Sequence, residues 1–181
     1  MAEARIGWIA GMPHFLPKLN NHLGFYMALT GKRLKSKDVM LSGMATHFVP
    51  SSRLGELELE LFHCKTEDIE ARLNAFSEPP GEFSLTPLLK DIDHCFSANT
   101  VEEVIERLTK VDSEWSKEML QMMAPLCPTM LKVNLRMMQL GKTLDLKEGL
   151  RMVHRVLSRG VGSYNAQEGL RSALVGGFTR V

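Results

Sequence analysis

Apolar residues recur at helical spacing along most of the chain, and polar or glycine residues separate the segments. The stretch NNHLGFYMALTG (20–31) has this spacing and stops at Gly31, which can adopt the left-handed conformation that ends helices. KSKDVMLSG (35–43) predicts a short second helix that ends near Gly43. The pattern therefore predicts a mainly α-helical chain.

One segment has the character of a β-strand instead. ATHFV (45–49) alternates, favours β structure and is closed by Pro50. A lone strand leaves backbone groups unpaired, and each costs about 1 to 3 kcal/mol when buried. Since the chain shows no set of strands that would complete a sheet, the strand is either exposed and marginal or pairs with sequence that lies outside this chain.

Capping residues mark the helices that follow. Thr100 and Glu103 in TVEE form a capping box, in which each side chain satisfies an amide of the first turn. Pro87 is tolerated in a first turn because its missing N–H has no helical partner there. EPPG (78–81) is too short for a domain linker, so we interpret it as a turn within one domain. The other predicted helices and caps are Ser51 or Ser52 before RLGELELELFHC, Thr66 before TEDIEARLNAF, Thr86 before LLKDIDHCF, SEWSKEMLQMM, PTMLKVNLRMMQL up to Gly141, LDLKEGLRMVHRVLSR up to Gly160, and AQEGLRSALV capped by Asn165 with Glu168 and ending at Gly176.

Size and charge limit the classes of function. The chain has 181 residues, of which 44% are hydrophobic, and this suffices for one globular domain with a core. A formal net charge of +1 gives no general attraction to nucleic acid or to an anionic membrane. The sequence contains no run of eighteen apolar residues, so no membrane span is predicted. We expect no nucleic-acid or membrane partner.

Cysteine and histidine show no metal-binding spacing. Cys64, Cys95 and Cys127 are odd in number and include no CxxC pair, so we expect reduced thiols. The six histidines form no HExxH motif, and we expect no metal site. Cys95 has no neighbouring base in the sequence, which argues against a nucleophilic role.

Four segments together carry a family resemblance. They are LGFYMALTGKRLKSKDVMLSGMATHFVPSSRL (23–54), CFSANTVEEVIERL (95–108), CPTMLKVNLRMM (127–138) and EGLRSAL (168–174). These segments resemble the 3-hydroxyisobutyryl-CoA hydrolases, a branch of the enoyl-CoA hydratase/isomerase (crotonase) superfamily, and specifically their C-terminal half. The resemblance implies a partial crotonase-like domain over 1–181. Residues 1–50 would be a remnant of the active-site segment with one strand, and 51–181 the helical region. The fold as a whole would be mainly α with one or two short strands. The β-spiral of the α/β fold would be largely missing.

The opening stretch MAEARIGWIAGMPHFLPKL (1–19) is similar to the family motif M-P-E-x-x-I-G-x-x-P-D-x-G-G-x-x-x-L. It matches at Met1, Glu3, Ile6, Gly7 and the trailing FLPKL. The resemblance implies that Glu3 is the catalytic glutamate, which attacks the thioester or activates water. The aspartate that binds the hydroxyacyl group in the family has no counterpart. In the other reading, Glu3 is a solvated acid beside a free amino terminus.

A basic cluster, Lys32, Arg33, Lys35 and Lys37, is the candidate site for the phosphates of coenzyme A, and a solvated face is the alternative. Methionines recur in the C-terminal half, where they either fill the core or form an adaptable groove. They are Met119, Met122, Met123, Met130, Met137, Met138 and Met152.

Two functions remain open. The first is hydrolysis of a short hydroxyacyl-CoA thioester in mitochondrial valine catabolism. The resemblance implies no metal and no redox cofactor, and coenzyme A is part of the substrate. The second is a truncated or spliced chain without turnover that acts as a helical interaction module, with self-association through its C-terminal helices.

A mitochondrial location is implied by the resemblance. The first 37 residues are basic, but Pro13 and Pro17 interrupt any amphipathic presequence helix, so a cytoplasmic location is the alternative.

Overall fold

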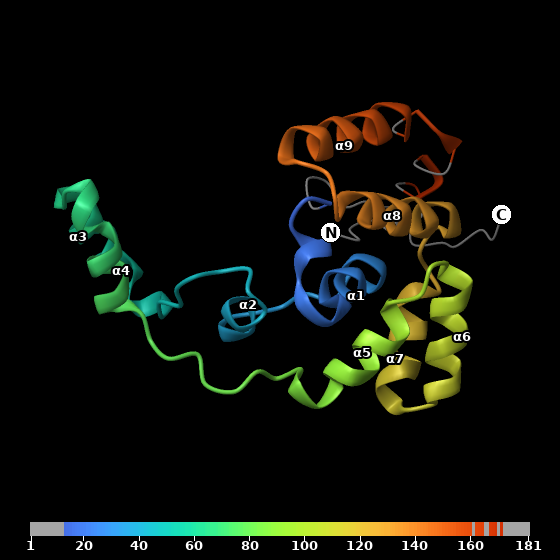
Figure 1. Cartoon of the computed structure of the whole chain (residues 1–181), viewed down its shortest axis with the longest axis horizontal. Helices are drawn as coiled ribbons and strands as arrows, with labels where there is room; N and C mark the ends of the chain where they lie inside the picture. Colours follow the sequence, from blue (N-terminus) through green and yellow to red (C-terminus); the bar gives the residue numbers. More distant parts are fainter. Residues whose placement is uncertain (1–12, 161, 165–166, 170, 172–181) are drawn as a thin grey trace. The chain divides into compact units, whose positions relative to one another are not determined.

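The computed structural model describes residues 13–160, 162–164, 167–169 and 171 (Figure 1). The described chain divides into two compact units, a larger one of residues 1–33 with 88–181 and a smaller one of residues 34–87. These borders differ from the division at residue 50 that the sequence suggests. Glu3 and Asn165 lie outside the described residues, as does most of the predicted helix up to Gly176.

Helices make up both units. Among its described residues the larger unit holds two 3₁₀ turns and six α-helices: Leu16–Lys18, Asn20–His22, α1 (Leu23–Thr30), α5 (Leu89–Phe96), α6 (Val101–Val111), α7 (Glu114–Met123), α8 (Pro128–Gly141) and α9 (Leu146–Gly160). The smaller unit holds α2 (Lys37–Leu41), α3 (Leu54–His63) and α4 (Ile69–Phe76), with 3₁₀ turns at Ser51–Arg53 and Thr66–Asp68; a further turn, Thr86–Leu88, crosses the border between the units. The predicted mainly helical class is confirmed.

Helix α1 forms the centre of the larger unit, because nearly all of its residues are buried and it contacts α5, α7 and α8. Tyr26 is fully buried, with its ring 5.3 Å from that of Phe96 in an edge-to-face arrangement and 6.2 Å from that of Trp115. Such aromatic pairs add about 0.5 to 1.5 kcal/mol beyond the area that they bury. The cluster therefore joins α1 to α5 and α7.

Methionines fill much of the remaining core. Five of the seven that the sequence analysis singled out are buried, namely Met119, Met123, Met130, Met137 and Met138. Met122 and Met152 are half-buried. The core-filling interpretation is confirmed for these five side chains.

Two glycines let the backbone of residues 13–16 approach the helices of the larger unit closely. A Cβ atom on Gly24 of α1 would lie 1.8 Å from the carbonyl oxygen of Leu16. A Cβ atom on Gly141 of α8 would lie 1.8 Å from the carbonyl oxygen of Pro13. Real Cβ atoms cannot come this close to backbone, so only glycine fits at either position.

Helix ends agree with the sequence in some places only. Gly31 ends α1 in the left-handed conformation, with φ 73°. The Thr100 hydroxyl accepts a hydrogen bond from the Glu103 amide at 3.2 Å, while the Glu103 carboxylate accepts from the Asn99 amide rather than from Thr100. The caps at Ser51 or Ser52 and at Thr66 are wrong, because short 3₁₀ turns precede α3 and α4 and no side chain caps either helix.

The predicted strand at 45–49 is also wrong, since the described residues contain no strand. Phe48 makes one backbone bond, accepting at its carbonyl from the Glu78 amide at 2.9 Å, and its own amide donates to the Ser77 hydroxyl at 3.2 Å. Pro79 and Pro80 follow Glu78 and have no N–H to donate. The pairing therefore stops after one bond, too soon to form a ladder.

In the smaller unit, α3 and α4 pack against each other as a helical hairpin, residues 54–76, which we call the α3–α4 hairpin. Leu57 and Phe76 are its buried side chains. The Arg53 guanidinium lies 4.4 Å from the centre of the Phe76 ring, and Arg72 pairs with Glu60 at 3.1 Å. Much of the apolar surface of the hairpin stays exposed, including Leu54, Leu59, Phe62 and Ile69.

We predict that Gly141→Ala lowers the free energy of unfolding by about 2 to 3 kcal/mol, because the new methyl group would overlap the Pro13 carbonyl. Gly55→Ala is the matched control. Nothing lies within 4 Å of a Cβ atom at Gly55, and alanine gains up to about 1 kcal/mol over glycine in a helix. Urea denaturation followed by circular dichroism measures both; equal effects of the two substitutions would contradict the close approach at Gly141.

Candidate functional site

The first described residues show where the segment with the predicted catalytic Glu3 joins the helices. Pro13 lies against Gly141 of α8, and a ring nitrogen of His14 lies 3.2 Å from the carbonyl oxygen of Leu144. Leu16 lies against Gly24 of α1. Glu3 itself is outside the described residues, so its catalytic role stays a prediction.

The four cations predicted to bind phosphate divide between the units. Lys32 and Arg33 belong to the larger unit, and Lys35 and Lys37 to the smaller. The Lys32 ammonium pairs with the Glu118 carboxylate at 2.7 Å, and this hydrogen bond raises the pKa of Lys32 above its ordinary value. The Lys37 ammonium lies 5.4 Å from the centre of the Phe48 ring, and Lys35 is exposed. A common site for all four also stays a prediction.

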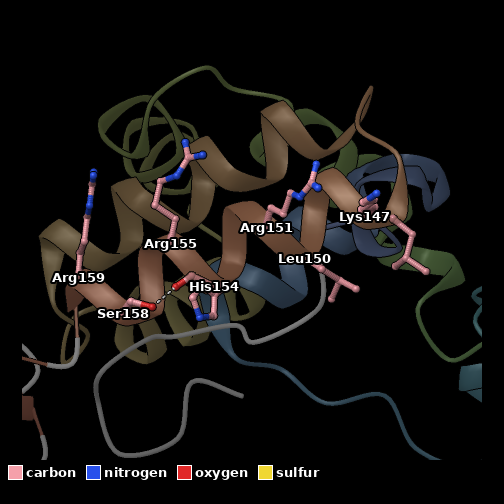
Figure 2. Close-up of a pocket in the computed structure, with 8 residues that line it drawn as sticks. Lys147, Leu150, Arg151, His154, Arg155, Ser158 and Arg159 are labelled. Carbon is pink, nitrogen blue, oxygen red and sulfur yellow. Dashed lines mark hydrogen bonds between the residues drawn. The ribbon is translucent and has the colours of Figure 1, made fainter.

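A second concentration of charge lies on the exposed face of α9, which we call the α9 basic face. Lys147, Arg151, Arg155 and Arg159 occupy every fourth position, and successive members are about 6 Å apart along a helix. Leu146, Leu150, His154 and Ser158 form the adjacent line, and the eight residues together line an open pocket. In Figure 2 the four long cationic side chains extend to one side of the helix, whereas Leu150 and His154 extend to the other.

The opposite side of α9 holds this helix in the larger unit. Gly149 and Val153 are buried, and a Cβ atom on Gly149 would lie 3.6 Å from the Cβ atom of His14. The helix begins with reciprocal bonds, in which the Asp145 carboxylate accepts from the Glu148 amide at 2.7 Å and the Glu148 carboxylate accepts from the Asp145 amide at 3.3 Å. Because α9 contacts α8 and its start is capped, the basic face is carried on an ordered helix.

The charge of the α9 basic face is not neutralised by its described neighbours. None of its four cations forms an ion pair with a carboxylate of the described residues. Glu148, the only acid within α9, is engaged at the start of the helix. The face therefore has the chemistry to attract an anionic group or an acidic protein surface.

Sequence reasoning missed this face, although the spacing of Lys147, Arg151, Arg155 and Arg159 was a readable signal. One line of cations at intervals of four residues lies on one side of a helix. The Asp145 and Glu148 pair, three residues apart, likewise marks the start of α9.

The other reactive side chains do not assemble a catalytic centre in the described part of the chain. His22 pairs with Asp93 at 2.8 Å, close to the surface. No group of three or more His, Cys, Asp or Glu residues suits a metal ion among the residues described. Likewise, none of the described helices combines the length and the apolar character that a membrane crossing requires.

Cys95 is fully buried in α5, and burial raises the pKa of its thiol to about 11, with the nearby Asp91 charge acting in the same direction. A thiol with so high a pKa is almost entirely protonated at neutral pH and is a poor nucleophile. This environment agrees with the sequence argument against nucleophilic use of Cys95.

A model of the family described as enoyl-CoA hydratase/isomerase matches residues 1–177. The chain belongs to the enoyl-CoA hydratase/isomerase family. It is 37% identical over 185 residues to human "3-hydroxyisobutyryl-CoA hydrolase, mitochondrial", covering 97% of this chain and 48% of that protein. The protein of the same name from Gallus gallus is 35% identical with the same coverage. The chain thus spans about half the length of these relatives.

Solved structures agree with the family assignment. The chain is similar to a carnitinyl-CoA dehydratase from Mycobacterium thermoresistibile, with a TM-score of 0.86, 29% identity, and coverage of 97% of this chain and 52% of that one. An enoyl-CoA hydratase from Rhodobacter sphaeroides gives a TM-score of 0.82 at 27% identity and covers 97% and 51%. The names of these relatives all describe enzymes of coenzyme A thioesters, so this chain is similar to enzymes of that class.

Burial of Cys95 predicts a distinct pH dependence of stability. An unfolded thiol loses its proton near pH 9, whereas the folded Cys95 thiol keeps it until about pH 11. The folded state binds more protons in this window, so the stability due to the buried thiol is present below about pH 9 and is lost as the pH rises toward 11. Urea denaturation at pH 8 and pH 10.5 should show a larger loss for the wild type than for Cys95→Ala.

Thiol labelling tests the same burial independently. Cys64 and Cys127 are half-buried and should react with Ellman's reagent in the native chain, whereas Cys95 should react only after unfolding. Labelling of Cys95 at the rate of the other two thiols in the folded protein would contradict its placement.

Proposed function

We propose that this chain forms the C-terminal part of a hydrolase that cleaves the thioester of a short hydroxyacyl-CoA, such as 3-hydroxyisobutyryl-CoA in valine catabolism. The observation that carries the proposal is the 37% identity to human 3-hydroxyisobutyryl-CoA hydrolase over 97% of the chain. The CoA-thioester class is supported more broadly, by the family match and by both solved structures. The choice of acyl group rests on the hydrolase relatives alone.

In this proposal Glu3 supplies the carboxylate that attacks the thioester carbonyl or activates water. The proposal assigns the binding of the coenzyme A phosphates to the basic cluster of Lys32, Arg33, Lys35 and Lys37. The proposal includes no metal. It includes no redox cofactor either, since thioester hydrolysis transfers an acyl group to water without a change of oxidation state. By resemblance to relatives whose names include "mitochondrial", we propose the mitochondrion as its location.

A second candidate is a helical interaction module without turnover. Two observations favour it. The opening segment has no counterpart of the aspartate in the family motif. In addition, the α3–α4 hairpin exposes large apolar side chains, which is typical of protein contact surfaces.

The decisive experiment measures coenzyme A release from 3-hydroxyisobutyryl-CoA by the purified chain. We expect release that Glu3→Gln lowers by at least a hundredfold and that the exposed control Glu67→Gln leaves unchanged, since removal of a catalytic acid–base group typically costs about 10² to 10⁴ in rate. Chromatographic separation of coenzyme A avoids the background from the protein thiols. Release no faster than in buffer would rule out the hydrolase for this chain and leave the interaction module.

The cation cluster gives a separate prediction. Lys35→Gln with Lys37→Gln should raise KM for the acyl-CoA severalfold without lowering kcat, because contacts to a distant phosphate are made equally in the ground state and the transition state. The matched control is Lys90→Gln with Arg136→Gln, two exposed cations of the larger unit. An unchanged KM would place the phosphates elsewhere.

A further inference from the structure

Two exposed surfaces of this chain have opposite charge and similar apolar content. One is the α9 basic face in the larger unit, and the other is the outer side of the α3–α4 hairpin in the smaller unit. Each is described by its own helices and side chains, and within its own unit no other described residues cover it. The basic face and the acidic hairpin are complementary in charge, whereas two copies of the same surface would carry like charges.

The α9 basic face combines four cations with exposed leucines. Leu146 is 46% exposed and Leu150 is 50% exposed, and both lie beside the line of cations that begins at Lys147. Residues 146–160 carry four Lys and Arg residues against one acid. Two such faces would repel each other, so a second α9 is an unfavourable occupant.

The α3–α4 hairpin has the reverse charge. Residues 54–76 carry six Asp and Glu residues against two Lys and Arg residues, a formal net charge of −4. Leu59 is 65% exposed and Phe62 is 84% exposed. Leu59 and Phe62 are three residues apart on one side of α3, so they form a joint apolar surface whose burial favours association. A second acidic hairpin is also an unfavourable occupant.

We propose that the α9 basic face of one copy docks on the α3–α4 hairpin of a second copy. An antiparallel crossing brings Leu59 and Phe62 to Leu146 and Leu150. The same crossing brings Glu56 and Glu60 of α3 toward the cations that follow Leu150 on α9. Glu56 and Glu60 are four residues apart on their helix, as are Arg151 and Arg155 on theirs, so the charges share a spacing of about 6 Å. The two acids pair within the smaller unit with Arg53 at 3.9 Å and Arg72 at 3.1 Å, and in the proposed contact they share these exposed pairs with the cations of α9.

The contact joins two different surfaces, so it is heterologous. After pairing, one copy keeps a free hairpin and the other keeps a free basic face. Association therefore continues beyond the dimer unless a ring closes. One helix on one hairpin makes an interface smaller than about 800 Å² per partner, the usual size for stable complexes. We expect association in the micromolar range that weakens with salt, because its ion pairs are exposed.

Charge reversal on each surface tests the pairing by analytical ultracentrifugation. The wild-type chain should associate with rising concentration, and 0.5 M NaCl should weaken this at least tenfold. Arg151→Glu with Arg155→Glu removes the basic surface, and Glu56→Arg with Glu60→Arg removes the acidic one. Each double variant alone should stay monomeric. Mixed in equal amounts, they should form a 1:1 dimer, since each still carries the surface that the other lacks.

The control Lys90→Glu with Arg136→Glu makes the same change of charge on other exposed positions and should associate like the wild type. Circular dichroism confirms that each variant is folded; Arg151→Gln with Arg155→Gln replaces the reversed pair if that variant unfolds. A wild type that stays monomeric at 100 µM overturns the proposal, as does a mixture of the two variants that stays monomeric. Unchanged association of both double variants overturns it too.

Discussion

The larger unit depends on two close backbone contacts that leave no room for a side chain at Gly24 and Gly141. Backbone oxygens of Pro13 and Leu16 occupy the space where Gly141 and Gly24 would otherwise carry a Cβ atom. These contacts fix residues 13–16 against α8 and α1, and α1 is in turn the most deeply buried helix of the unit. The segment that carries the family motif therefore enters the helices at a defined place, although Glu3 lies outside the described residues.

The two units differ in how they are stabilised. The larger has a dense core of aromatic and methionine side chains around Tyr26. The smaller buries few apolar side chains, and residues 34–87 carry five Lys and Arg residues against nine Asp and Glu, a formal net charge of −4. The chain as a whole is close to neutral, so its total charge conceals a strong internal separation of charge. Averages over a sequence exclude a uniformly charged surface, but they do not exclude two opposed ones.

The ends of helices could be predicted where a residue has one clear structural role. Gly31 ends α1 in the left-handed conformation, and Thr100 caps the start of α6. Prediction failed at Ser51, Ser52 and Thr66, because hydroxyl residues favour turns as well as caps and here they begin 3₁₀ turns. For the site, the sequence offered Glu3 and the cluster from Lys32 to Lys37 through resemblance only. The α9 basic face needed the helix to be in place, because its residues are neighbours in space and not in sequence.

The proline pair after Glu78 has a consequence for the behaviour of the chain in crowded solution. Residues 45–49 have the composition of a strand and only one backbone bond to residue 78. An extended segment of this kind is a template on which other chains can stack in register, the first step toward fibrils. Pro79 and Pro80 have no N–H to donate, so the segment beside residues 45–49 cannot itself extend into a paired strand on which further chains could stack.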